Sequence, residues 1–368
     1  MTDFGVYVHV PFCARRCDYC DFATWTDRHH LMAAYAAACV TDLRRRYDSQ
    51  PVPPATSVFF GGGTPSLLPA ELLVAILDTI RRTDDAEVTV ECNPDTVTPE
   101  LLAAYRAGGV NRLSFGVQSM APHVLAALGR THDPAGVERA VAAARHAGFD
   151  NFNVDLIYGA AGETMADWRA SLDAVLALDP PHVSAYALTV EPGTPLARGI
   201  EAGALDGPDD DDQAEKYLAA DAALAGAGRP WYEISNWARP GHECRHNLLY
   251  WAQGEYVGVG CAAHGHTPAG RRWWNVRTPD RYIAAVESGA SAEGGHEVLD
   301  DGDREREAAM LALRTRRGVP AGPAAGGLAV DGLAERCGDR FVLTPKGRLL
   351  ANEATTRLLS ARTGSRSA

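Results

Sequence analysis

Residues 6–22 read VYVHVPFCARRCDYCDF, a short apolar strand that leads directly into a loop with three cysteines. The alternation of valine with tyrosine and histidine favours a β-strand. The cysteines Cys13, Cys17 and Cys20 follow as Cys-x3-Cys-x2-Cys. Three thiolates on one tight loop suit three corners of an iron–sulfur cubane and leave one iron open to another ligand. This stretch therefore predicts a metal cluster at the end of a first strand.

Zinc is the main alternative occupant of this loop. Structural zinc sites usually present four ligands in paired arrangements, whereas no histidine stands near the loop at a matching spacing. The remaining cysteines are scattered, at Cys39, Cys92, Cys244, Cys261 and Cys337. Because free cysteine packs as a small hydrophobe, we expect each of these to be a reduced and inert thiol.

Short runs of β-branched and aromatic residues recur along the first two-thirds of the chain, separated by amphipathic, alanine-rich segments. The expected strands span residues 6–10, 57–60, 87–91, 112–117, 151–158 and 182–190. Strand–helix units in series indicate a parallel sheet that is covered on both faces. Six units are too few for the usual closed eight-stranded barrel. We therefore predict an α/β fold with an open, partial (β/α)6 barrel rather than a doubly wound sheet.

The pattern changes after about residue 230. We expect the barrel in residues 1–230, an irregular connecting region rich in Trp, Tyr and Gly in 231–295, a small winged-helix-like α+β module in 296–360 and a disordered tail in 361–368. Arginines in the module raise DNA binding as an alternative. Charges of both signs are interspersed there, however, which is typical of a solvated helix face.

The chain as a whole has 368 residues, 46% of them hydrophobic, and a formal net charge of −12. The composition is that of an ordinary globular protein, and the acidic balance argues against a general nucleic-acid binder, which needs a basic surface. The sequence opens without a basic, then apolar, leader and contains no run of 18 apolar residues. We therefore expect a cytoplasmic protein that binds no nucleic acid and has no stable membrane insertion.

A second motif, FFGGGTP at residues 59–65, follows the second expected strand. Glycines let a backbone approach a ligand closely, and exposed amide and carbonyl groups can hold an amino-acid end. A tight turn would explain the same run equally well. Because ligands bind at the carboxyl edge of parallel α/β folds, we expect both loops to contribute to one site.

Together these motifs resemble the radical S-adenosylmethionine (SAM) superfamily, in which the methionine end of SAM binds the fourth iron and the reduced cluster cleaves SAM to a radical. Over essentially the whole chain, the sequence is similar to the oxygen-independent coproporphyrinogen III oxidase family, and specifically to its HemW-type haem chaperone branch. The motifs that carry the resemblance are, in order, YVHVPFCARRCDYC, GGGTPS, ECNPD, RLSFGVQS, LGRTH and NVDLIYG.

The resemblance implies a 4Fe–4S cluster on the three cysteines and a set of residues around SAM. That set comprises Tyr7, Tyr19, Gly62, Gly63, Thr64, Glu91, Gln118, Arg130 and Asp155. Carboxylates and an amide suit ribose hydroxyls and an ammonium group, and Arg130 can pair with a carboxylate through its planar guanidinium. Without the resemblance, Glu91 or Asp155 could equally have a purely structural partner.

Two absences argue against the oxidase branch. That branch adds a fourth cysteine, at the position of Phe22 here, and a longer N-terminal arm, for which Cys13 lies too near the start. In favour of the chaperone branch, residues 245–251 read RHNLLYW and match its HNxxYW motif. His246 is thus the first haem candidate, since imidazole binds haem iron and aromatic rings pack against the macrocycle. A buried structural histidine is the alternative.

His264, His266 and Cys261 are secondary haem candidates in the segment GCAAHGHTP. The leading hypothesis is a protein that binds a SAM-coordinated cluster and haem, and delivers haem to acceptors such as respiratory proteins, without coproporphyrinogen oxidase activity. The alternative is a radical SAM oxidoreductase of porphyrin biosynthesis. The intact set of polar SAM residues favours that alternative, because a pure binding protein would not obviously need it. No catalytic residue is assigned.

Overall fold

A curved sheet of twelve strands forms the centre of the molecule, in a computed structural model that describes residues 3–49 and 51–365. Seven neighbouring strands run parallel, in the order β9-β1-β2-β3-β4-β5-β6. They are β1 (Phe4–Val10), β2 (Ala55–Gly62), β3 (Arg82–Cys92), β4 (Arg112–Gln118), β5 (Phe152–Tyr158), β6 (His182–Ala187) and β9 (Glu255–Val259). The predicted α/β fold with an open parallel barrel is confirmed, and β9 adds a parallel strand that the sequence did not predict.

Antiparallel strands extend both edges of this parallel section. They are β7 (Trp231–Glu233) and β8 (Asn236–Ala238) beside β6, and β10 (His264–His266), β11 (Arg271–Asn275) and β12 (Glu293–Val298) beyond β9. The segment expected to be an irregular connection therefore supplies strands to both ends of the same sheet. The predicted domain boundary at residue 230 remains a proposal.

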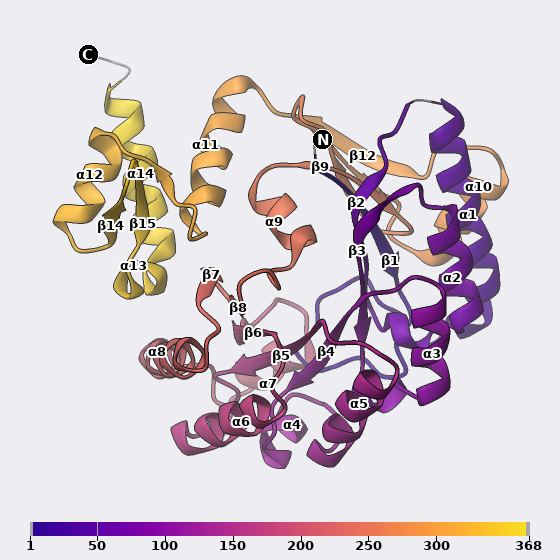
Figure 1. The fold of residues 1–368 in the computed structure, drawn as a ribbon, viewed down its shortest axis with the longest axis horizontal. Helices are drawn as coiled ribbons and strands as arrows, with labels where there is room; N and C mark the ends of the chain where they lie inside the picture. The colour runs from indigo at the N-terminus through magenta and orange to yellow at the C-terminus, as the bar shows by residue number, and fades with distance from the viewer. Residues whose placement is uncertain (1–2, 50, 366–368) are drawn as a thin grey trace.

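Most helices of the barrel lie on the outer side of the curved sheet, as α1, α2, α3, α5 and α6 show in Figure 1. The helices are α1 (Met32–Ser49), α2 (Ala70–Thr79), α3 (Pro99–Ala107), α4 (Pro122–Ala127), α5 (Pro134–His146), α6 (Met165–Ala177), α7 (Pro195–Glu201), α8 (Asp210–Gly226), α9 (Arg245–Trp251) and α10 (Pro279–Glu287), with 3-10 turns η1 (His29–Leu31), η2 (Pro65–Leu67) and η3 (Pro94–Thr96). Helix α9 is different, because it lies on the concave side and packs against β1 and β2.

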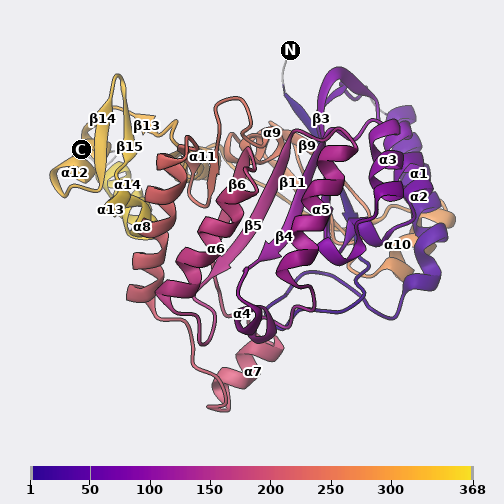
Figure 2. The same ribbon diagram turned by 60° about the horizontal axis from the view of Figure 1, so that its bottom comes forward.

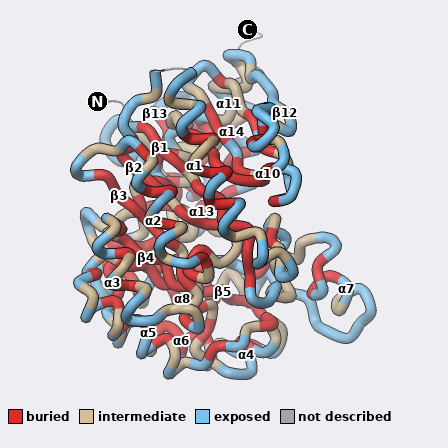
Figure 3. The backbone as a smooth tube through the Cα atoms, turned by 90° about the vertical axis from the view of Figure 1, so that its right-hand side faces the viewer, coloured by how far each residue is buried: buried red, intermediate tan, exposed pale blue. Residues whose placement is uncertain are grey.

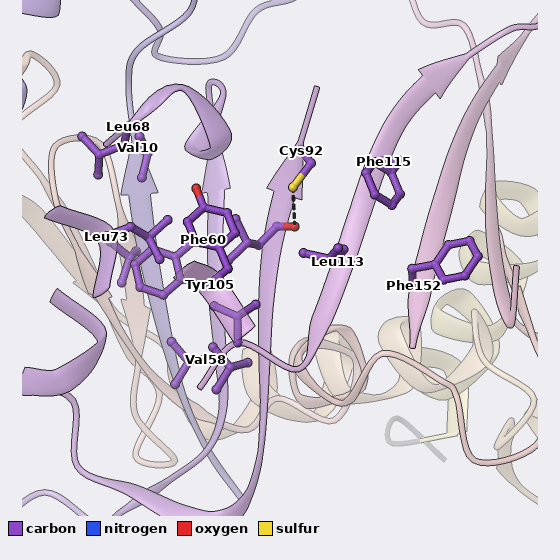
Figure 4. Packing of buried hydrophobic residues seen from close by; sticks show 14 of the residues in the cluster. Val10, Val58, Phe60, Leu68, Leu73, Cys92, Tyr105, Leu113, Phe115 and Phe152 are labelled. Atoms are coloured by element: carbon purple, nitrogen blue, oxygen red, sulfur yellow. Dashed lines mark hydrogen bonds between the residues drawn. The ribbon is translucent and has the colours of Figure 1, made fainter. Parts of the chain in front are cut away.

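The core lies between the sheet and its outer helices, as the buried interior in Figure 3 shows. Figure 4 shows side chains from successive strands in this layer, among them Val58, Phe60, Leu113 and Phe115, with Tyr105 of α3 against them. Each of these five side chains is fully buried. Helices cover this outer face of the sheet, and the strand residues that point toward them are accordingly apolar.

Short-range sequence signals mark both ends of α3. Thr98 caps α3 by accepting a hydrogen bond from the Leu101 amide at 3.1 Å, with Pro99 in the first turn. At the other end of the helix, Gly108 keeps right-handed dihedral angles and Gly109 is left-handed (φ 95°), so the chain turns at Gly109.

At the carboxyl edge of the parallel strands, α4 and α7 project beyond the other helices (Figure 2). They share a small apolar cluster, to which Leu128 after α4 and Leu196 of α7 belong together with Ile157 of β5 and Leu188 after β6. Tyr19 of the cysteine loop packs against this cluster. This edge of the sheet therefore has its own packed support.

A small module follows the sheet. It contains α11 (Asp301–Leu313), β13 (Val319–Pro320), α12 (Pro323–Val330), β14 (Ala334–Cys337), β15 (Arg340–Leu343), α13 (Pro345–Leu349) and α14 (Ala351–Ser365), with the antiparallel order β13-β15-β14. The module has a core of its own around Leu313, Leu343 and Leu358. The expected α+β module is therefore present.

The predicted disordered tail began at residue 361, but α14 continues to Ser365, because each residue added to an existing helix gains a backbone hydrogen bond. Residues 366–368 of the predicted tail lie outside the described residues. Within the described ranges, none of the helices combines the length and apolar character that crossing a membrane requires.

Candidate functional site

The cysteine loop connects β1 to η1 and is held by backbone hydrogen bonds near both its base and its tip. The Cys13 amide donates to the Trp25 carbonyl at 3.1 Å, and the Trp25 amide donates to the Pro11 carbonyl at 2.8 Å. Near the tip, the Asp18 amide donates to the Leu128 carbonyl at 3.3 Å. The loop is therefore built into the carboxyl edge of the sheet.

All three thiols of this loop are free, and donors from other strand ends reach two of them. Arg130 donates from Nη1 to the Cys17 sulfur at 3.5 Å, and the Thr64 hydroxyl donates to the Cys13 sulfur at 3.7 Å. Burial raises the pKa of Cys13 and of Cys20, whereas a metal ion would deprotonate the thiols it binds. Hydrogen-bond donors beside the sulfurs suit thiolates that carry a cluster.

Across residues 3–49 and 51–365, no three His, Cys, Asp or Glu side chains converge closely enough to share a single ion. A cubane cluster does not need ligands that converge on one ion, because each of three irons takes one thiolate. Sulfur is the donor that iron–sulfur clusters prefer. The chemistry of this donor set therefore fits an iron–sulfur cluster.

The glycine-rich loop after β2 lies directly against the cysteine loop. The Gly63 amide donates to the Val10 carbonyl and the Thr64 amide donates to the Phe12 carbonyl, both at 2.8 Å. A Cβ atom on Gly63 would lie 2.7 Å from the Phe12 oxygen and 3.1 Å from the Cys13 sulfur, so only glycine permits this approach. These two amides therefore join the two loops. That the glycine run also holds the methionine end of SAM stays a prediction.

Glu91, at the end of β3, is a half-buried carboxyl group beside the same loop. It accepts a hydrogen bond from the Gly62 amide at 3.1 Å. Burial and, to a smaller extent, nearby Asp155 raise the pKa of Glu91 to about 8, although the hydrogen bond from Gly62 opposes the shift. Glu91 therefore holds a proton at pH 7 and can donate a hydrogen bond to a ligand.

Asp155 belongs to a polar network inside the barrel that the sequence reasoning largely missed. It accepts hydrogen bonds from the Ser114 hydroxyl at 2.9 Å and from Asn153 Nδ2 at 2.7 Å. Burial raises its pKa, and hydrogen bonds from Ser184, Ser114 and Asn153 oppose this shift. The network surrounds a cavity of about 220 Å³ that Tyr7, Glu91 and His246 also line.

A readable signal for this network exists in the sequence. Polar residues occupy every second position at the starts of three neighbouring strands, at Arg112 and Ser114, at Asn153 and Asp155, and at His182, Ser184 and Tyr186. Period-two alternation places such residues on one face of a sheet. Here they face the barrel interior, where Arg112 is only 1% exposed.

His246 lies on α9 inside the barrel, where it is 1% exposed. Its Nδ1 is 2.9 Å from the Ser57 hydroxyl and its Nε2 is 2.8 Å from the Tyr250 hydroxyl. Burial lowers its pKa to about 3, so the ring is neutral. Both nitrogens that could bind iron are thus engaged in this arrangement, as the alternative of a structural histidine predicts.

A cavity of about 1070 Å³ opens beside the two loops. Three predicted SAM residues, Tyr7, Gly62 and Glu91, line one part of it, and His264 and His266 line another. The further lining residues include Phe22, Tyr250, Tyr256, Arg272, Trp274, Arg277 and Arg281. The last three strands of the sheet, which the sequence did not predict, thus form much of the wall.

The remaining predicted residues lie outside the lining of this cavity. Cys261 is fully buried, and the Tyr35 hydroxyl donates to its sulfur at 3.6 Å. Arg130 also donates to the Gly116 carbonyl at 2.6 Å. Gln118 ends β4 in a left-handed conformation (φ 65°), which is uncommon for a residue with a side chain and typical of sites where function constrains the backbone.

The fold and these loops can now be compared with known proteins. Residues 7–175 match the radical SAM superfamily. The structure of Escherichia coli coproporphyrinogen III oxidase (HemN), described as a radical SAM enzyme, aligns with a TM-score of 0.84 and 23% identity over 97% of this chain and 90% of that chain. At this identity the match shows a shared fold.

Two curated relatives from bacteria narrow the class. The protein from Mycobacterium tuberculosis named heme chaperone HemW is 44% identical over 97% of this chain and 95% of its own length. The Bacillus subtilis protein of the same name is 35% identical over 95% of this chain and 97% of its own. The chain belongs to the HemW family of the radical SAM superfamily.

Proposed function

We propose that this protein is a haem chaperone that binds a SAM-coordinated 4Fe–4S cluster and haem, and delivers haem to acceptor proteins, including respiratory ones. The observation that carries the proposal is the cavity of about 1070 Å³, which joins predicted SAM residues to a second group of aromatic, histidine and arginine side chains. A cavity of this size slightly exceeds the usual range of about 300–1,000 Å³ for ligand pockets. It offers space beyond that of one cofactor.

In this proposal, Cys13, Cys17 and Cys20 hold the cluster, which supplies one-electron chemistry toward SAM when both are bound. Arg130, which contacts the Cys17 sulfur, orients that loop and can pair with the methionine carboxylate of SAM. The remaining residues around SAM are Tyr7, Tyr19, Gly62, Gly63, Thr64, Glu91, Gln118 and Asp155. Protonated Glu91 donates to a ligand oxygen, and the buried Asp155 accepts from hydroxyl or ammonium groups.

Phe22 supports the chaperone function over porphyrinogen oxidation. It stands where the oxidase branch has a further cysteine, and its side chain is 58% exposed on the cavity wall. An exposed aromatic ring there provides an apolar surface in place of a sulfur ligand. The cytoplasm is the proposed compartment, because all eight cysteines are free thiols, including the exposed Cys337.

A paired assay tests the proposal. Cluster-reconstituted protein is titrated anaerobically with haem and then mixed with an apo-cytochrome, while a second sample receives SAM, a strong reductant and coproporphyrinogen III. We expect stoichiometric haem binding, transfer to the apo-cytochrome and no protoporphyrinogen above background. Matched formation of 5′-deoxyadenosine and protoporphyrinogen would instead establish the oxidase, which the polar set around Glu91 and Asp155 otherwise favours.

A further inference from the structure

Helix α9 holds His246 against the concave face of the sheet (Figure 1), where a glycine permits the close approach. A Cβ atom on Gly5 of β1 would lie 2.5 Å from Leu249 Cδ2 and 3.0 Å from His246 Cε1. On the next strand, Ser57 pairs in register with Gly5 and reaches the same ring, with its hydroxyl oxygen 2.9 Å from His246 Nδ1. The His246 ring therefore lies directly between α9 and two strands of the sheet.

Packing fixes the plane of the His246 ring but does not decide which edge of the ring faces the sheet. The ring is stacked on Phe59, with centroids 5.5 Å apart and planes inclined by 28°. A half-turn about the Cβ–Cγ bond keeps the plane of an imidazole and exchanges each nitrogen with a carbon. Hydrogen bonds to the nitrogens distinguish these two orientations, and Ser57 supplies the bond on the side of the sheet.

The two nitrogens of this ring face different surroundings. Ser57 is 1% exposed and lies outside the lining of both cavities, so Nδ1 is closed off from them. Nε2 is 2.8 Å from the hydroxyl of Tyr250, which lines the small inner cavity and the large one. A neutral imidazole carries a proton on one nitrogen and a lone pair on the other, and a metal binds the lone pair. Nε2 is therefore the nitrogen that a ligand in the large cavity reaches when the Tyr250 hydroxyl turns aside.

We infer that Ser57 is a positioning residue for haem binding, because its oxygen accepts a hydrogen bond from Nδ1–H of His246 and so presents the Nε2 lone pair to the haem iron. The iron then takes the place of the Tyr250 hydroxyl at Nε2, and the bond to Ser57 keeps the ring oriented. A hydrogen bond at the nitrogen that does not bind the metal also raises the basicity of a histidine ligand. This inference rests on the proposed haem-binding function and gives a role in it to a strand residue outside the motifs that carry the family resemblance.

A double-mutant cycle on the cluster-reconstituted full chain, titrated anaerobically with haem, tests this inference. The variants are Ser57→Ala, His246→Ala and the two combined, with Ser57→Thr as the variant that keeps the hydroxyl. Ser171→Ala is the matched control, because Ser171 is also 1% exposed and its hydroxyl contacts Ser119 and the Met120 amide instead. Circular dichroism and iron content establish that each variant is folded and loaded. The readouts are the haem affinity and the iron–histidine stretching frequency of bound ferrous haem.

We expect Ser57→Ala to weaken haem binding about ten- to a hundredfold and to lower the iron–histidine stretching frequency, because the ring loses the partner that orients it and raises its basicity. His246→Ala should lack the iron–histidine band, and adding Ser57→Ala to it should cause no further loss of affinity. Ser57→Thr should restore both readouts toward the wild-type values, and Ser171→Ala should match the wild type.

Three outcomes overturn the inference while haem binding itself stands. They are wild-type affinity and frequency in Ser57→Ala, an equal loss from Ser57→Ala with and without His246, and an iron–histidine band that persists in His246→Ala. Wild-type protein that binds no haem would contradict the proposed function as well, so the two failures are distinguishable.

Discussion

At the scale of single residues, the site depends on the close approach of two loops and on a carboxyl group that burial keeps neutral. Glycine at position 63 lets two loops meet, because a Cβ atom there would lie 2.7 Å from the Phe12 oxygen. Burial keeps Glu91 protonated to about pH 8. The first feature can be tested through the iron and sulfide content of the protein, and the second through the pH dependence of its stability.

Gly63→Ala should lower the cluster content. The added methyl group would lie 2.8 Å from the Val10 oxygen and 3.1 Å from the Cys13 sulfur, so the cysteine loop must shift away from β2. We expect less than about half of the wild-type iron and sulfide per chain, with circular dichroism unchanged, since overpacking is absorbed locally at a cost of about 1–3 kcal/mol. Gly226→Ala is the matched control, because nothing lies within 4 Å of its new Cβ. Equal iron in both variants would contradict the prediction.

Glu91→Gln should change how stability depends on pH. The pKa of Glu91 rises from an ordinary 4.5 to about 8 on folding, so the folded chain holds a proton that the unfolded chain releases. Stability is therefore lost as pH rises through this window, and the loss is on the order of a few kcal/mol. Denaturation midpoints between pH 5 and 8.5 should fall with pH in the wild type and fall less in Glu91→Gln. The exposed Glu201→Gln should follow the wild type.

At the scale of elements, the sequence predicted the six parallel strands well, since apolar runs between helices such as VYVHV specify buried parallel strands. It missed β9, because Glu255–Val259 is short and interrupted by Gly258. It also missed β7, β8 and β10–β12, which are short antiparallel strands whose pairing depends on distant partners.

The functional site was less predictable from the sequence than the six parallel strands were. Cysteine spacing and glycine runs mark local loops, and the structure brings these two loops into contact. Tyr256, Arg272 and Trp274 of the cavity wall come from strands that the sequence did not predict, so no local pattern could assign them to the site. His246 was visible as a motif, but its two hydrogen bonds depend on packing that a sequence motif does not describe.

Helix α9 depends on a carboxylate from another element. Glu87 of β3 accepts hydrogen bonds from the amides of Arg245 at 2.9 Å and His246 at 3.4 Å, and so caps the first turn inside the barrel. Glu87 is 7% exposed, and Arg112 lies 4.0 Å from its other oxygen. A negative charge at this end stabilises a helix.

Glu87→Gln should therefore loosen α9, because a neutral amide keeps the size but loses the charge, at a cost of about 1–3 kcal/mol. We expect amide hydrogen exchange to accelerate about tenfold or more within α9, with α2 unchanged. Glu71→Gln, an exposed carboxyl in the first turn of α2, is the control. If hydrogen exchange accelerated throughout the sheet, the substitution would have destabilised the whole protein, which would contradict a local role for Glu87 at α9.

At the scale of the whole molecule, the C-terminal module is attached to the barrel by charged contacts. Arg348 of α13 donates two hydrogen bonds to Asp221 of α8, at 2.7 and 2.6 Å, and lies 4.7 Å from the Trp231 ring. Helix α11 of the module supplies Glu307, which pairs with Arg272 on the cavity wall. The position of the module thus bears on the shape of the large cavity, which Glu307 and Arg272 both line.

Arg348→Met should release the module from the barrel. Removing one partner of a buried ion pair costs about 3–5 kcal/mol, and the Arg348 and Asp221 side chains are only 6% and 19% exposed. We expect calorimetry to resolve an earlier transition for the module, and hydrogen exchange to accelerate in β14 and β15 but not in β1–β6.

Arg348→Lys should give an intermediate result, because an ammonium group cannot form the two parallel bonds. Arg357→Met is the matched control, since the Arg357 pairs are about half exposed and such pairs contribute about 0–1 kcal/mol. If Arg348→Met behaved like this control, apolar packing rather than the Arg348–Asp221 pair would hold the module in place.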